Sequence, residues 1–171
     1  FDYARALERT EAFFWWFCDN YVELVKGRTY DDARPDAADS AKRALRTALS
    51  VVQRLLAPTL PFATEEAWSW WNDSSVHTAS WPAPIAGGEP FGDAALVDIP
   101  IEVLTRVRRA KTEAKRSQRA VVESLLVTAP TAALDALGAG RADLVDAGSI
   151  RSLDVVEGGE LDVVVTLAPD D

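Results

Sequence analysis

Residues 55–71, LLAPTLPFATEEAWSWW, decide the fold of this chain: they hold two prolines three residues apart, two adjacent glutamates and three tryptophans. Apolar residues at helical spacing over residues 41–55 run into this stretch and predict a helix. Pro58 ends that helix, because the residue before a proline is disfavoured in the α conformation. Pro61 then fixes the turn, so the stretch predicts a rigid corner between two packed helices.

A short helix is expected to follow the corner. Thr64 is a good N-cap residue, and Glu65 and Glu66 place negative charge on the first turn, where the helix dipole favours it. General acid or base catalysis is the less favoured alternative for this pair. Trp68 lies far enough into the helix to face the core.

Two long helices precede the corner. Residues 1–25 carry apolar side chains at three- and four-residue spacing, and between residues 12 and 18 this helix is apolar on most of its circumference. A helix of that kind is normally buried on all sides. Gly27 is expected at its C′ position, and residues 28–36 predict a polar loop. The second helix is predicted from Pro35 or Asp36 to Ala57.

The pattern changes after the corner. Residues 72–100 contain four prolines and predict an irregular connection that Trp81 anchors, and residues 101–117 predict a helix. Valine- and leucine-rich segments at residues 120–128, 149–156 and 160–167 predict strands, the last two joined as a hairpin at Gly158 and Gly159. Residues 131–137 and 141–147 predict two short helices.

These elements predict a mainly α protein in two domains. Residues 1–99 form a helical bundle, and residues 100–171 form a small α/β domain with about three strands. The chain has no run of 18 apolar residues and no signal peptide, and it has one cysteine, Cys18, and one histidine, His77. We therefore expect no membrane span, no metal site, no catalytic residue and a cytoplasmic location.

Charge is distributed unevenly. The net charge of −9 argues against a general nucleic-acid binder, yet residues 101–119 carry seven basic and two acidic side chains, a net charge of +5. On a helix, Arg108, Lys111, Lys115 and Arg119 would form one stripe suited to phosphates. The alternative is a solvated face that balances the acidic segments. The candidate RNA-binding residues here are Arg106, Arg108, Arg109, Lys111, Lys115, Arg116 and Arg119.

Three further candidates lie near the first helix. Lys26 and Arg28 follow its C-terminal end, where they complement the helix dipole; the family resemblance given below implies a contact to an RNA stem-loop as the alternative. Trp15 and Trp16 are adjacent and cannot both face inward, so Trp15 is a candidate for stacking on a base or for a protein interface.

Three motifs resemble one family of enzymes. The corner, L-x-P-x-x-P-F-x-T-E-E-x-W, is similar to a signature of the helical anticodon-binding domain of class I valyl-, isoleucyl- and leucyl-tRNA synthetases. Residues 17–26, FCDNYVELVK, and residues 75–82, SVHTASWP, resemble segments of valyl-tRNA synthetases. The motif residues of the corner are Pro58, Pro61, Phe62, Thr64, Glu65, Glu66 and Trp68.

The resemblance implies the C-terminal part of such a synthetase. It implies tRNA(Val) and the remaining synthetase domains as partners, with aminoacylation by ATP and Mg²⁺ carried out outside this chain, which lacks HIGH-like and KMSKS-like motifs and has no cofactor site. Family members carry further bundle helices, so some residues that read the anticodon are expected upstream of Phe1.

Two other functions compete with tRNA binding. The first is a helical protein–protein interaction module that uses its aromatic side chains. The second is a standalone enzyme, which the lack of a catalytic constellation disfavours. The apolar stretch over residues 12–18 also predicts that the isolated chain forms a homodimer or higher oligomer through the first helix.

Overall fold

The computed structural model describes residues 2–83 and 92–169 of the chain. It divides into two compact units, which we call the helical unit, residues 1–22 and 32–89, and the sheet unit, residues 23–31 and 90–171. The predicted mainly α fold with a small three-stranded part is confirmed. The division into domains at residues 99 and 100 stays a prediction; in the compact units, residues 23–31 group with the sheet.

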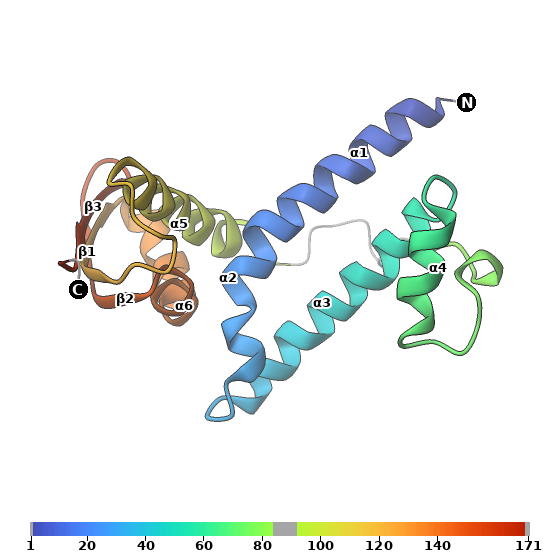
Figure 1. Ribbon diagram of the computed structural model, residues 1–171. Helices are drawn as coiled ribbons and strands as arrows, with labels where there is room; N and C mark the ends of the chain where they lie inside the picture. The colour runs from blue at the N-terminus through green and yellow to red at the C-terminus, as the bar shows by residue number, and fades with distance from the viewer. Residues whose placement is uncertain (1, 84–91, 170–171) are drawn as a thin grey trace. The chain divides into compact units, whose positions relative to one another are not determined.

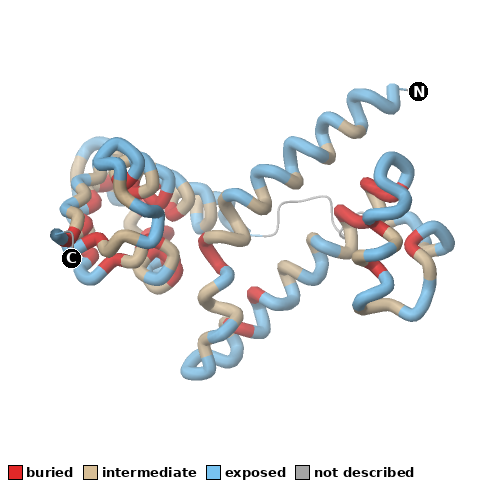
Figure 2. The backbone as a smooth tube through the Cα atoms, in the orientation of Figure 1, coloured by how far each residue is buried: buried red, intermediate tan, exposed pale blue. Residues whose placement is uncertain are grey.

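The helical unit begins with a long, incompletely covered helix. Helix α1 (Tyr3–Trp16) continues into a π-helical stretch, η1 (Phe17–Val22), and contacts α3 (Pro35–Leu56). No residue of α1 is buried, so this apolar helix is left uncovered, as its many aromatic side chains and few partner helices predict (Figure 2). The rings of Phe13, Phe17 and Tyr21 stack successively along the helix, with centroids 5.7 and 5.4 Å apart.

The corner after α3 forms as the prolines dictate, but its caps differ from expectation. Helix α3 ends at Leu56, and α4 (Pro61–Ser69) has Pro61 in its first turn. The expectation that Thr64 is an N-cap is wrong, because Leu60 occupies that position. Thr64 is buried inside α4, and its hydroxyl donates to the Leu60 carbonyl at 2.8 Å.

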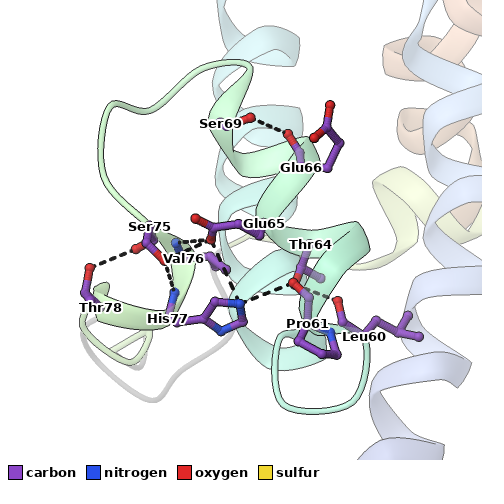
Figure 3. A network of polar contacts seen from close by, with 10 residues as sticks. All are labelled: Leu60, Pro61, Thr64, Glu65, Glu66, Ser69, Ser75, Val76, His77 and Thr78. Carbon is purple, nitrogen blue, oxygen red and sulfur yellow. Dashed lines mark hydrogen bonds and ion pairs between the residues drawn. The ribbon is translucent and has the colours of Figure 1, made fainter.

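The two glutamates of the corner make side-chain contacts rather than complementing a helix start. Glu65 accepts hydrogen bonds from the Ser75 hydroxyl and the Val76 backbone N–H, both at 2.9 Å, and so holds the 3₁₀ turn η3 (Val76–Thr78) against α4 (Figure 3). Glu66 accepts from the Trp70 indole N–H at 3.2 Å. His77 Nε2 lies 3.2 Å from the Pro61 carbonyl oxygen.

Trp68 is buried, as expected. Its core cluster contains Ala57 and Val76, with Trp71 and Ala79 packed against it, so its neighbours come from the corner and η3. Trp81 is 63% exposed, and the expectation that it anchors the following connection is wrong. Part of that predicted connection, including Pro84 and Pro90, lies outside the described residues.

The sheet unit has two helices on one face of three strands. Its elements are α2 (Glu23–Val25), η2 (Gly27–Tyr30), α5 (Ala95–Glu113), β1 (Val122–Ala129), α6 (Thr131–Gly148), β2 (Ile150–Glu157) and β3 (Asp162–Leu167). Helices α5 and α6 lie together on one face of the sheet (Figure 1). Leu125 and Val127 are buried, and their strand neighbours Leu126 and Val164, which pair across β1 and β3, are exposed.

The predicted hairpin between β2 and β3 is wrong. The strand order is β2-β1-β3, with β1 parallel to β2 and antiparallel to β3. Helix α6 provides the crossover that two parallel strands require. Glycines at 158 and 159 therefore make the chain pass from one edge of the sheet to the other, and Gly158 donates to the Ala129 carbonyl at 2.8 Å.

The two short helices predicted over residues 131–147 are one helix, α6. Gly138 and Gly140 lie within it and do not break it. A Cβ at residue 140 would stand 2.6 Å from the Pro100 ring, so Gly140 permits the close approach of α5 and α6. Packing therefore outweighs the weak helix propensity of glycine here.

Candidate nucleic-acid interface

The basic segment is shorter as a helix than its sequence suggests. Helix α5 ends at Glu113, and Lys115 has a left-handed backbone with φ of 56°. Lys115 and Arg119 therefore lie beyond the helix, and the expected stripe through Arg108, Lys111, Lys115 and Arg119 does not form.

Lys111 is a structural residue inside the sheet unit. It is 1% exposed, and its Nζ donates to the carbonyl oxygens of Gly148 at 2.8 Å and Gln118 at 3.0 Å. Burial, with a smaller contribution from the charge of Arg108, lowers the pKa of the Lys111 ammonium below its usual 10.5. The expectation that Lys111 lies on an exposed face is wrong, because its ammonium group ties α5 to the end of α6.

Other cations of the segment also have partners within the unit. Arg106 donates to the Leu161 carbonyl at 2.9 Å and pairs with Glu102 at 2.7 Å. Arg116 donates to the Ala168 carbonyl at 3.1 Å. Arg109 pairs with Glu113 at 2.8 Å, and this hydrogen bond raises the pKa of the guanidinium. Their roles as RNA contacts stay predictions.

Several of the predicted residues converge on one hollow of about 380 Å³, which we call the α5–α6 hollow. Four basic residues line it, together with the carboxylates of Glu23 and Asp146. Glu23 pairs with Lys26 at 2.7 Å and lies 3.8 Å from Arg108. The basic residues are Lys26, Arg108, Lys111 and Arg119. Cations thus outnumber carboxylates, and a phosphate group would find several hydrogen-bond donors here.

Arg28 is held by an internal ion pair. Its guanidinium is bidentate to the carboxylate of Asp143 on α6, with Nε 3.0 Å from Oδ1, and Asp143 is 4% exposed. Gly27 is not a left-handed C′ residue but begins η2, and a Cβ there would collide with Asp146. The close approach of η2 to α6 places Arg28 for this pair. Its predicted role with RNA is not tested.

Trp15 lies on α1 in the helical unit, apart from the unit that carries the basic candidates. It is 59% exposed, and its ring meets that of Phe14 edge-on at 5.2 Å. Trp15 is therefore accessible; it belongs to the helical unit, and the α5–α6 hollow belongs to the sheet unit.

The sequence analysis missed a second hollow, of about 450 Å³, on the helical unit. Arg43, Arg46, Thr47, Ser50 and Trp71 line it, and we call it the α3 hollow. The Arg46 guanidinium lies over the Trp71 ring at 5.4 Å from its centroid. The missed signal was the second half of α3, which carries four basic residues and no acidic one between residues 42 and 56.

The described residues offer little for catalysis or metal binding. Across residues 2–83 and 92–169, no group of three or more His, Cys, Asp or Glu side chains lies together so that it could hold a metal ion. Burial, and then Asp19, raise the pKa of the Cys18 thiol, which opposes reactivity. None of the described helices is long and apolar enough to cross a membrane.

Comparison with known proteins identifies the family. The model of the anticodon-binding domain of tRNA ligase matches residues 1–126. The chain is 47% identical to a valine–tRNA ligase of Leifsonia xyli subsp. xyli over 175 residues, which cover 100% of this chain and 20% of that protein. It is 49% identical to a valine–tRNA ligase of Thermobifida fusca over residues that cover 99% of this chain and 19% of that protein. The chain thus spans about a fifth of the length of these curated relatives.

The matched residues include all three motifs in residues 17–82. The resemblance to the anticodon-binding domain of valyl-tRNA synthetases, which these motifs indicated, is confirmed. This chain belongs to the family of anticodon-binding domains of tRNA ligases.

Proposed function

We propose that this chain is a tRNA-binding region of a valine–tRNA ligase, which recognises and orients tRNA(Val). The observation that carries the proposal is the family match over residues 1–126, together with the valine–tRNA ligase relatives. Aminoacylation with ATP and Mg²⁺ would belong to other domains of the parent enzyme in the cytoplasm. We infer no cofactor site in this chain, which alone should show no ATP/pyrophosphate exchange.

The α5–α6 hollow supports this function by its donors. Lys26 and Arg119 are exposed, and Arg108 is partly exposed, so phosphate oxygens could reach all three. Contacts of this kind position an RNA without reading its sequence. Since the chain carries a net charge of −9, the contact would be confined to such local cationic surfaces.

The test is a titration of labelled tRNA(Val) transcript at several salt concentrations between 50 and 200 mM. The double variant Arg108→Gln/Arg119→Gln should bind more weakly, and the log–log salt slope should shrink by roughly 0.7–0.9 for each lost phosphate contact. Arg109→Gln is the matched control, because Arg109 pairs with Glu113 on the same helix and does not line the hollow.

Specificity requires a second arm with a non-cognate tRNA. Tighter binding of tRNA(Val) supports the recognition part of the proposal, and equal binding would limit the role of this chain to orientation. Failure to bind either tRNA at 50 mM salt would refute the proposed function.

Exposed aromatic rings on α1 favour a second candidate, a protein interface. Phe13, Trp15 and Trp16 are 45%, 59% and 40% exposed within the last turn of α1. We propose that the isolated chain forms a homodimer through this face. Sedimentation at micromolar concentrations should show a concentration-dependent mass, and Trp15→Glu should shift it toward the monomer. A monomeric parent chain at all concentrations would contradict the dimer.

A further inference from the structure

The α3 hollow joins two unpaired arginines to an aromatic ring. Among the described residues, neither Arg43 nor Arg46 has a carboxylate within 4.0 Å, and both side chains are exposed. Uncompensated guanidinium groups attract anions, and phosphate matches their planar donor geometry. This pair therefore differs from the arginines of α5, most of which have partners within their own unit.

Trp71 provides a rigid support for Arg46. The indole N–H of Trp71 donates to the side-chain oxygen of Gln53 at 3.2 Å, and its ring lies 5.2 Å from that of buried Trp68. The indole is thus fixed by a hydrogen bond on one side and by the corner core on another. A platform fixed before binding loses little conformational entropy when a ligand arrives.

A guanidinium group has two flat faces. The guanidinium carbon of Arg46 lies over the Trp71 ring, 5.4 Å from its centroid, and Arg46 is an exposed residue. Unpaired bases stack on arginine planes as well as on aromatic rings, and each stack tolerates any base. Arg43, one helical turn before Thr47 on the same hollow, is available for a neighbouring phosphate.

We propose that the α3 hollow binds one unpaired nucleotide of an RNA strand, with the base stacked on Arg46 and a phosphate held by Arg43. The hydroxyl groups of Thr47 and Ser50 line the same hollow and offer hydrogen-bonding groups to the sugar. This inference rests on the proposed function that the chain binds RNA, and it adds a site in the unit that carries no part of the α5–α6 hollow.

The test uses the complete chain and two fluorescent probes, a ten-nucleotide single-stranded oligouridylate and a ten-base-pair RNA duplex. Arg46→Gln should weaken binding of the single strand about 5- to 100-fold, the range expected for the loss of one stacked base. Arg46→Lys should lose most of the same affinity, because lysine keeps the charge but has no plane to stack on. Duplex binding should change less than threefold.

Two further variants separate phosphate binding from general attraction. Arg43→Gln should reduce the salt slope for the single strand by about 0.7, the value for one phosphate contact. Lys42→Gln is the matched control, since Lys42 is an exposed cation on the same helix and does not line the hollow, and it should stay within twofold of the parent chain. Circular dichroism melts establish that each variant is folded.

Several results would overturn the inference. Normal single-strand binding by Arg46→Lys would show that charge alone is involved, and equal losses for Lys42→Gln and Arg43→Gln would show a diffuse cationic surface. Displacement of the oligouridylate from the parent chain by polyglutamate at equal charge concentration would indicate an acidic protein ligand instead.

If tRNA binding depends on Arg108 and Arg119 but not on Arg46, this inference alone fails. If no RNA binds, the proposed function fails with it.

Discussion

Helices α3 and α5 are both basic in sequence but differ in how their charges are used. The segment around α5 has the stronger signal, a net charge of +5 over residues 101–119, yet Lys111 is buried and Arg106, Arg109 and Arg116 are bound within their own unit. The second half of α3 has fewer cations, but Arg43 and Arg46 stand without carboxylate partners among the described residues.

The difference shows that charge density along a chain does not measure charge available to a ligand. The cations of α5 find their partners in carboxylates of α5 and α2 and in backbone carbonyl oxygens that flank the strands, such as that of Leu161. Among the described residues, Arg43 and Arg46 on α3 have no carboxylate within 4.0 Å. Partners that are far away in sequence, such as Leu161 for Arg106, decide which cations are available.

The largest expected effect concerns the core that supports the α3 hollow. Trp68→Ala should lower the free energy of unfolding by about 3–5 kcal/mol, the usual cost of removing a large buried aromatic side chain. Because Trp68 packs on Trp71, binding of single-stranded RNA should weaken as well. Urea unfolding followed by circular dichroism checks the first part, and a melting temperature within one or two degrees of the parent would contradict it.

A smaller loss is expected when the internal pair of the sheet unit is broken. Arg28→Ala leaves the carboxylate of Asp143 buried without its partner, and should cost about 3 kcal/mol. The double variant Arg28→Ala/Asp143→Ala should cost less than the sum of the single changes, because no uncompensated charge remains. Unchanged stability combined with weaker tRNA binding would mean that Arg28 serves the RNA instead.

Lys111 tests whether a cation of α5 is structural. Lys111→Met keeps the volume of the side chain but leaves the Gly148 and Gln118 carbonyl oxygens without their donor, and should cost about 2 kcal/mol at pH 7. Chemical denaturation measures this loss. A variant as stable as the parent but weaker in tRNA binding would return Lys111 to the RNA-binding residues.

The pH dependence gives an independent check on Lys111. Its pKa in the folded chain is lowered by burial, so between that value and the usual 10.5 the unfolded chain binds more protons than the folded chain. The free energy of unfolding of the parent therefore rises with pH in that window, and Lys111→Met lacks this rise. The difference in stability between the two should widen as pH approaches 10.5; a constant difference would contradict the lowered pKa.

The smallest expected effect compares one arginine from each helix. Arg109→Gln should leave stability nearly unchanged, because it removes an exposed ion pair, and should leave the salt slope of RNA binding unchanged. Arg43→Gln should also leave stability unchanged, but it should reduce the salt slope of RNA binding. Equal slopes for both variants would erase the difference between α3 and α5.

The sequence by itself determined the local features of this protein. Pro58 and Pro61 set the corner, since proline restricts the backbone wherever it stands, and segments rich in valine and leucine marked the three strands to within two residues. The family followed from short motifs in residues 17–82. Part of the candidate interface followed from the positions of basic residues in the sequence, because Lys26, Arg108 and Arg119 do line one hollow.

Only the tertiary structure decided how distant segments meet. Strand β1 lies between β2 and β3 because α6 places β2 beside β1 and the connection at residues 158–161 then carries the chain to the opposite edge, and no local signal at Gly158 and Gly159 encodes that order. Burial of Lys111, pairing of Arg28 with Asp143 and the position of Arg46 over Trp71 all join residues brought together by packing. A side chain's type fixes what it can bind, whereas its neighbours in space fix what it does bind.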